Sequence, residues 1–193
     1  LYNKLVMVEF KGTKSSWGLV AKLFHWLLAI LLFWQVATGI SLHNMEFSPL
    51  KIGFITTHKF FGTIIFSLVV LRLIWKYVFN THPKYENIPF FHKLVSNLVH
   101  FVLYSLVIFI PIQGTYMTWL GGGDVYLLGL IKIPQLIEMD FILYPQALDI
   151  HYYSALTLTA FFSIHIAAAF YHRFIIKDKY GVWNRMALKK NRV

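Results

Sequence analysis

The 193-residue chain is 58% hydrophobic and only 13% charged, with a mean hydropathy of +0.59 and a formal net charge of +10. Soluble domains average about 25% charged residues, so this composition excludes an ordinary soluble protein and indicates one that lies in a membrane. The chain has no cysteine, which excludes haem attached through a Cys-x-x-Cys-His motif and iron–sulfur clusters held by thiolates alone.

Four continuous apolar stretches account for this composition. They cover residues 17–40, 55–78, 94–120 and 150–176, and each is long enough for a membrane-spanning helix, which needs ~20 residues. Long unbroken stretches favour helices over the alternating strands of a membrane barrel. The first stretch is too long for a cleavable signal peptide, so we expect it to remain. The expected fold class is all-α: an integral membrane four-helix bundle that forms a single membrane domain over residues 1–193, with a basic tail at 177–193.

The basic residues divide unevenly between the two sides of these spans. One side has only Lys51, Lys59 and Lys132. The other has fifteen, namely Lys4, Lys11, Lys14, Lys22, Arg72, Lys76, Lys84, Lys93 and the seven of the tail from Arg173 to Arg192. Because basic residues accumulate on the cytoplasmic side of membrane proteins, we expect both termini in the cytoplasm. The charges flank spans and do not cover a soluble face, so nucleic acid is not an expected partner.

The two expected outer loops differ in length. The first, residues 41–53, is short, whereas the second, residues 121–149 between helices three and four, is long and begins with three glycines. No Lys-Ser/Thr follows these glycines, so they do not form a nucleotide-binding loop. Two apolar stretches of the long loop, residues 125–130 and 133–137, are expected to lie along the membrane surface as a lid.

Histidines inside the spans are the main functional signal, because an ionisable side chain in hydrocarbon is costly. His151 and His165 are fourteen residues apart, which places them ~21 Å apart along a helix and within ~40° of one face. The same interval joins three further pairs: His25 to Gly39, His58 to Arg72, and His100 to Gly114. We therefore expect each helix to turn one face toward two cofactor levels.

Depth in the membrane pairs the histidines. His25 and His165 lie toward the cytoplasmic side, whereas His58 and His151 open their helices on the outer side; His100 is the rival inner ligand. The residue four positions after a histidine lies on the same helical face. This residue is small after each of the four expected ligands, but after His100 it is Tyr104. We therefore expect His100 to be a neighbour of the cofactor and not a ligand. The four small residues are Ala29, Gly62, Ala155 and Ala169. Close helix packing also explains small residues.

Two nitrogens at each level suit the axial positions of a b-type haem, and filling both positions favours electron transfer over oxygen binding. Zinc is a weaker interpretation because its sites need three or four converging ligands. A di-iron site is also disfavoured, because such sites use glutamates and no span contains Glu or Asp.

Several motifs together resemble the bacterial cytochrome b561 family, which is related to the haem-b subunits of nickel–iron hydrogenases. The resemblance runs from Trp17 to Met186 and is carried by Phe24-His25-Trp26, His58-Lys59-x-x-Gly62, Leu71-Arg72-Leu73, Val99-His100-x-x-Leu103-Tyr104, Ile110-Pro111-x-x-Gly114 and His165-x-Ala167-Ala168-Ala169-x-x-His172. It implies a four-helix bundle in the bacterial inner (cytoplasmic) membrane, two haem b groups and exchange with the quinone pool. It also places His25, His58, His151 and His165 on the haem-ligand positions.

Three further residues are candidates for accessory roles. Arg72 lies at the inner level and is expected to neutralise a haem propionate, although a snorkelling arginine would lie there too. Lys59, beside the outer ligand, is a candidate for the same role at the outer haem. His172 is expected to exchange protons with a quinone, since imidazole titrates near neutrality; its alternative role is that of an interfacial histidine.

The expected function is a transmembrane diheme b-type cytochrome that passes electrons between an outer partner and the quinone pool. Similar family members are superoxide:quinone oxidoreductases; if this chain is an enzyme, it is a quinone-linked oxidoreductase. The alternative is a haem-b anchor subunit for a periplasmic dehydrogenase, a hydrogenase or cytochrome c. A more remote alternative is a proton channel or transporter that uses a histidine relay and binds no haem.

Overall fold

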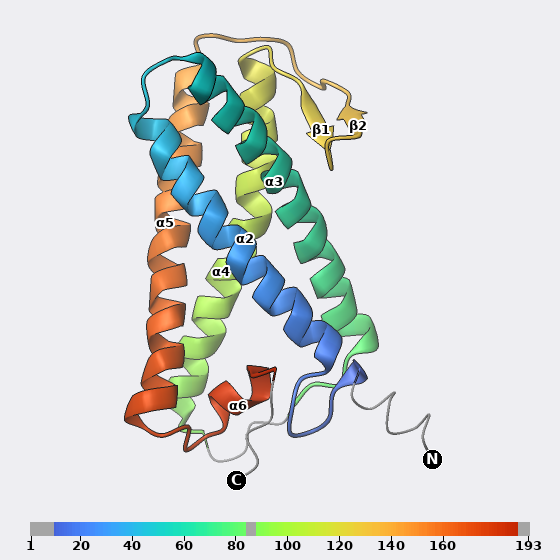
Figure 1. Ribbon diagram of the computed structural model, residues 1–193, viewed down its shortest axis with the longest axis vertical. Coiled ribbons are helices and arrows are strands. Elements are labelled where there is room, and N and C mark those ends of the chain that lie inside the picture. Colours follow the sequence, from blue (N-terminus) through green and yellow to red (C-terminus); the bar gives the residue numbers. More distant parts are fainter. Residues whose placement is uncertain (1–9, 84–87, 189–193) are drawn as a thin grey trace.

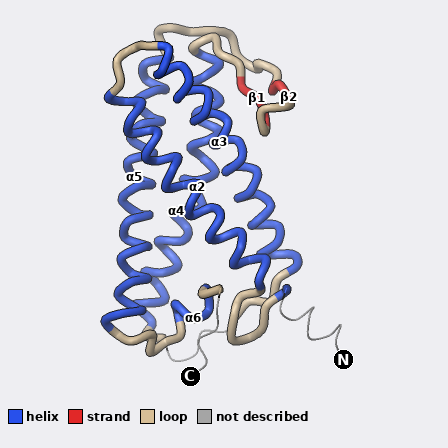
Figure 2. Tube along the Cα trace, viewed as in Figure 1, coloured by secondary structure: helices blue, strands red, loops and turns tan. Residues whose placement is uncertain are grey.

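Four long helices pack side by side in the computed structural model, which describes residues 10–83 and 88–188 (Figures 1 and 2). In the described part of the chain, four helices of 26 to 32 residues are long and apolar enough to cross a membrane. Each of them overlaps one expected span. They are α2 (Leu19–Asn44), α3 (Pro49–Ile74) with the π-helical turn η1 (Trp75–Phe79), α4 (Phe90–Leu120), and α5 (Tyr144–Phe170) with the π-helical turn η2 (Tyr171–Ile175).

Polar caps extend the helices beyond the apolar stretches. The Ser48 hydroxyl accepts a hydrogen bond from the Lys51 N–H at 3.2 Å, and Pro49 occupies the first turn of α3. Both features favour a helix start, so α3 begins at Pro49 and not at residue 55. Only residues 45–48 then separate α2 from α3. The short loop expected at 41–53 is therefore mostly helical, because hydropathy alone does not detect a capped polar turn.

The long connection between α4 and α5 contains a β-hairpin. Strands β1 (Val125–Leu127) and β2 (Ile131–Ile133) pair antiparallel, with Val125 opposite Ile133. Leu128 and Gly129 between them have φ of 53° and 72°, as in the tight turns that match strand twist. The all-α expectation thus omits one short hairpin in a mostly helical fold, and the expected position of this loop along the membrane surface stays a prediction. The available signal was two short runs with apolar residues at alternate positions, Val125 and Leu127, then Ile131 and Ile133, on either side of a glycine.

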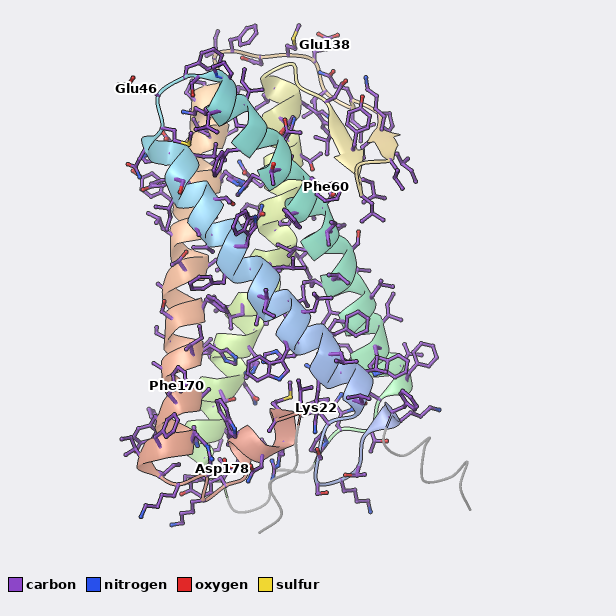
Figure 3. All side chains as sticks on the ribbon, viewed as in Figure 1. Lys22, Glu46, Phe60, Glu138, Phe170 and Asp178 are labelled. Atoms are coloured by element: carbon purple, nitrogen blue, oxygen red, sulfur yellow. The ribbon has the colours of Figure 1, made fainter. Side chains whose placement is uncertain are left out.

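The hairpin folds back along α3. The Leu128 N–H donates to the Thr63 hydroxyl at 3.2 Å, and a Cβ built on Gly129 would lie 3.0 Å from the ring of Phe60, which Figure 3 labels. The helix α6 (Val182–Met186) lies at the opposite end of the bundle (Figure 1). We call these two ends the hairpin end and the α6 end.

The buried core lies between the two ends. Ile65, Val107 and Leu158 are buried together with Leu28 and Val69. The first three stand seven residues, or about two helical turns, after His58, His100 and His151. Large apolar residues such as Ile30 and Phe33 are exposed on the outside, where lipid surrounds a membrane bundle. A thin apolar layer thus separates two regions of the interior.

Candidate cofactor sites

Two cavities of about 850 and 860 Å³ lie on either side of this layer. Both fall within the 300–1,000 Å³ that is usual for cofactor sites. Each of the four long helices contributes to both cavities at its fourteen-residue interval. The α6-side cavity is lined by His25, Arg72, His100 and His165, and the hairpin-side cavity by Gly39, His58, Gly114 and His151.

The histidines face each other in two pairs. The ring centroids of His58 and His151 are 6.2 Å apart at an interplanar angle of 75°, and those of His25 and His165 are 6.0 Å apart at 84°. Two imidazoles that bind one metal from opposite sides, with metal–nitrogen bonds of about 2 Å, have centroids about 6 Å apart. We call these the hairpin-side pair and the α6-side pair. Their spacing leaves room for one metal ion between the rings.

The donor set selects the kind of metal centre. Among the described residues no group of three or more His, Cys, Asp or Glu side chains converges on a point. Each site therefore offers two nitrogens, which is too few for a bare structural or catalytic zinc ion. A haem iron takes four of its ligands from the porphyrin and needs only two from the protein, so the residues present fit a haem.

Two buried polar residues hold the hairpin-side pair. Thr38 Oγ1 lies 3.1 Å from His58 Nδ1, and Gln113 Oε1 lies 3.0 Å from His151 Nδ1. Ligating histidines usually donate their second ring N–H to such an acceptor, which fixes the ring and its tautomer. Sequence reasoning missed both residues. A Thr and a Gln inside apolar spans were the available signal, since polar groups there need partners.

Glycines give the imidazoles of this pair their space. A Cβ on Gly114 would lie 2.9 Å from His151 Cε1, and one on Gly39 would lie 3.3 Å from His58 Cε1. Gly62 has a different role, since its Cβ would meet the Gln35 amide at 3.3 Å, and that amide donates to the His58 carbonyl. Gly62 also lines the hairpin-side cavity, so the small residue after His58 contributes both to the cavity wall and to helix packing.

The α6-side pair has a third histidine beside it. The ring of His100 lies 5.1 Å from that of His165, centroid to centroid, and its Nδ1 donates to the Ser96 carbonyl at 2.6 Å. This ring is closer to His165 than the about 6 Å that a shared metal requires, so His25 is the better placed partner of His165. Arg72 faces the same cavity and donates from Nε to the Tyr104 hydroxyl at 3.1 Å.

The mouth of the α6-side cavity contains more titratable groups. His172 lies 5.9 Å from His92 and 6.3 Å from Tyr180, ring to ring. Its Nδ1 is buried and makes no hydrogen bond with the described part of the chain. His92 lies in the first turn of α4. The structure therefore brings His172 to the edge of the α6-side cavity, apart from the facing pair.

Helix α6 covers this cavity and is held by a buried carboxylate. Asp178 accepts hydrogen bonds from the N–H groups of Trp183 and Asn184 at 2.9 and 3.0 Å. The Trp26 indole donates to the Met186 carbonyl at 3.0 Å, and the Trp183 ring stacks on Phe170, which Figure 3 labels together with Asp178. Sequence reasoning gave α6 no role, because its five residues carry no helical periodicity.

Lys59 connects the hairpin-side cavity to the hairpin. Its ammonium group donates to the Asp124 carbonyl at 2.8 Å, and Lys132 forms a salt bridge of 2.9 Å with the Asp124 carboxylate. Lys59 also lines the cavity, as expected of a residue beside the ligand. The bond to Asp124 adds a second role, because it fastens the long connection to α3.

Comparison with known proteins places the chain in a family. A family model described as prokaryotic cytochrome b561 matches residues 16–187. The chain is also similar to "Cytochrome b561 homolog 2" of Escherichia coli (strain K12), with 22% identity over 183 residues that cover 89% of this chain and 92% of that protein. The match includes both facing pairs and both cavities. The chain belongs to the prokaryotic cytochrome b561 family.

Proposed function

We propose that this protein, a membrane haem b electron-transfer protein by its family, is a diheme cytochrome. It passes electrons across the bacterial inner membrane between a partner at the hairpin end and the quinone pool. The observation that carries the proposal is the facing pair of imidazoles in each of two cavities, at centroid distances of 6.0 and 6.2 Å. A bound haem would supply a one-electron centre at each level.

The orientation follows from charge. Lys51, Lys59 and Lys132 belong to the hairpin end, and the other described basic residues lie toward the α6 end. Lys4, Lys84 and the tail beyond Leu188 lie outside the described residues. The bias of basic residues toward the cytoplasm supports a cytoplasmic α6 end and a periplasmic hairpin end.

Each residue of the two sites has a proposed role. His25 and His165 bind the iron of the α6-side haem, and His58 and His151 bind that of the hairpin-side haem. Arg72 pairs with a propionate of the α6-side haem, since its guanidinium faces that cavity from within the span. Lys59 does the same on the hairpin side, and His100 packs against His165 without binding iron.

His172 is the proposed proton-exchange group for quinone. Reduction of a quinone consumes two protons, and the imidazole of histidine gains and loses a proton near neutral pH. The buried Nδ1 of His172 at the cavity mouth makes no hydrogen bond to the described residues, which leaves it able to bind a quinone oxygen. His92 faces it and connects it to the cytoplasmic surface.

The partner at the hairpin end is either a small molecule or a protein. Superoxide oxidation requires cations that attract the anion, and Lys59 and Lys132 are the candidates, although Asp124 engages both. A second function is supported by the long connection, which exposes Leu130 and Ile142 by 83% and 81%. Leu136 and Phe141 of the same connection are also exposed, and apolar residues that form a continuous surface patch are typical of protein or membrane contacts. This supports an anchor role for a dehydrogenase, hydrogenase or cytochrome c.

The first experiment counts haem. Pyridine-haemochrome assay of purified protein is expected to give about two b haems per chain. His165→Ala and His58→Ala should each remove one haem, whereas His43→Ala should remove none; His43 lines the hairpin-side cavity but stacks on Tyr152. Absence of haem after haem-replete expression would contradict the proposal and favour the histidine-relay channel.

The second experiment tests the quinone role. Quinol-driven haem reduction, followed by stopped flow, should slow at least about tenfold in His172→Gln, because a general acid–base group contributes that much or more. Haem content and spectrum should stay unchanged. His82→Gln is the control, since His82 lines the same cavity but contacts Trp17 and Tyr77. Equal rates in the two variants would exclude His172 from quinone chemistry.

A further inference from the structure

The hydrogen bonds around Thr38 define which nitrogen of His58 carries the proton. The Thr38 hydroxyl lies 3.0 Å from the Trp34 and Gln35 carbonyls, to which it donates. Its hydrogen is therefore used, and its oxygen accepts from His58 Nδ1–H at 3.1 Å. With Nδ1 protonated, the lone pair of His58 is on Nε2. The Thr38 side chain is only 3% exposed, so water does not compete.

Gln113 does the same for His151 from another helix. Its amide nitrogen donates to the Ala147 carbonyl at 2.5 Å, which fixes the amide orientation and turns Oε1 toward His151. The carbonyl oxygen has no hydrogen to give, so His151 Nδ1–H is the donor at 3.0 Å. Gln113 is 6% exposed. Both hairpin-side imidazoles thus present Nε2 lone pairs and donate Nδ1–H to neutral oxygens.

The α6-side pair lacks this arrangement. Within the described ranges 10–83 and 88–188, neither His25 nor His165 makes a hydrogen bond from Nδ1 to a side-chain oxygen. The cavity contains Arg72 and Lys76 instead. The hairpin-side cavity is also lined by two cations, Lys51 and Lys59, which donate to the Met45 and Asp124 carbonyls. The two sites therefore differ most in the acceptors on the ligand nitrogens.

This difference affects the redox equilibrium of a bound iron. An acceptor on Nδ1–H makes the imidazole a stronger electron donor, which stabilises ferric over ferrous iron. A nearby cation in a low-dielectric site stabilises the more negative, reduced state. The hairpin-side acceptors lower the midpoint potential and the α6-side cations raise it.

We propose that Thr38 and Gln113 are positioning residues that orient the hairpin-side ligands and give the hairpin-side haem the lower midpoint potential. Electrons then pass from the hairpin side to the α6 side. This inference rests on the proposed diheme function and adds to it the direction of electron flow and the residues that set it. With the proposed orientation, the direction is from periplasm to cytoplasmic side.

A redox titration with both haems resolved tests the inference. The hairpin-side haem, identified as the one that His58→Ala removes, should titrate at the lower potential. Thr38→Val should raise the midpoint potential of the hairpin-side haem by about 59 mV, which for a one-electron couple corresponds to a tenfold change in the oxidised-to-reduced ratio. The potential of the other haem should stay unchanged. Thr38→Ser, which keeps the hydroxyl, should restore the original value.

Thr159→Val is the matched control, because Thr159 lines the same cavity but donates to the Ala155 carbonyl. If Thr38→Val fails to fold, Gln113→Glu gives a test of opposite sign, since a carboxylate acceptor should lower the potential. Two outcomes would overturn this inference and leave the proposed function intact. In one, neither acceptor variant changes the potential of either haem. In the other, the hairpin-side haem has the higher potential. A wild-type protein without two haems would overturn the proposed function and this inference together.

Discussion

The hairpin-side and α6-side pairs differ in what surrounds two similar arrangements of imidazoles. The hairpin-side rings are enclosed by Gly39 and Gly114 and bound at Nδ1 by Thr38 and Gln113. The α6-side rings have His100, Arg72 and a cavity mouth at His172. The hairpin-side rings thus contact glycines and neutral hydrogen-bond acceptors, whereas the α6-side rings lie beside an arginine and a third histidine. The comparison indicates that one helical register can place two facing pairs of imidazoles while local packing gives the pairs different surroundings.

The largest effect is expected from filling the glycine space on the hairpin side. Gly114→Ala places a methyl group 2.9 Å from His151 Cε1, closer than real contacts allow, so the imidazole must leave its position. One b haem per chain should be lost in the pyridine-haemochrome assay. Gly39→Ala, with a milder contact of 3.3 Å, should keep both haems and change only the spectrum of one.

Gly53→Ala is the control, because nothing lies within 4 Å of a Cβ at that position of α3. It should bind two haems like the wild type. If Gly114→Ala also keeps both haems with unchanged spectra, the hairpin-side site is looser than the structure indicates. The tight packing of glycines against the hairpin-side imidazoles would then no longer distinguish the two sites.

Much of this arrangement was predictable from the sequence, and the reason is periodicity. The interval of fourteen residues put His25, Arg72, His100 and His165 at one level, and the structure brings these residues to one cavity. The spans followed from apolar length. What the sequence did not reveal depends on contacts between helices: Gln113 reaches His151 across 38 residues of chain, and no local pattern encodes that contact.

The sequence also failed to predict several features of the loops and of the helix ends. Turn and cap chemistry in short segments determines the hairpin around Gly129 and the start of α3 at Ser48. Hydropathy is averaged over longer windows and does not detect such short signals. Helix α6 is held by Asp178 through two backbone N–H groups, so its position is a tertiary feature. The hairpin and α6 each contribute residues to the lining of one cavity.

The next largest effect concerns the charge on the α6 side. Arg72→Leu removes a cation that faces His25 and His165 in a low-dielectric cavity, so the α6-side midpoint potential should fall while the hairpin-side potential stays. Arg72→Lys should restore part of the difference. Arg173→Leu is the control, since Arg173 contacts Phe174 in η2. Equal shifts of both haems would remove the electrostatic distinction between the sites.

A smaller, local effect is expected at helix α6. Asp178→Ala removes the acceptor for the Trp183 and Asn184 N–H groups, and loss of such a cap costs about 1 kcal/mol. Hydrogen exchange of residues 182–186 should accelerate, with no change in the hairpin. Asp149→Ala, at an exposed carboxylate in α5, should leave exchange at α6 unchanged. Unaltered exchange in Asp178→Ala would show that Trp26 and Phe170 hold α6 without the carboxylate.

The smallest effect is expected from the exposed ion pair on the hairpin. A hydrogen bond to the Asp124 carboxylate and its negative charge raise the pKa of Lys132 above the usual lysine value. A raised pKa means that the ammonium contributes fully below the usual value and loses its effect only as pH rises through the higher one. Between about pH 6 and pH 9 the charge state of the ion pair is therefore constant, and solvent screens the interaction.

Lys132→Ala should match the wild type in thermal unfolding and haem content at both limits of this pH range. A clear loss of stability would instead show that the hairpin depends on its surface charges, whereas the bonds from Lys59 to the Asp124 carbonyl and from Leu128 to Thr63 support attachment from its inner face.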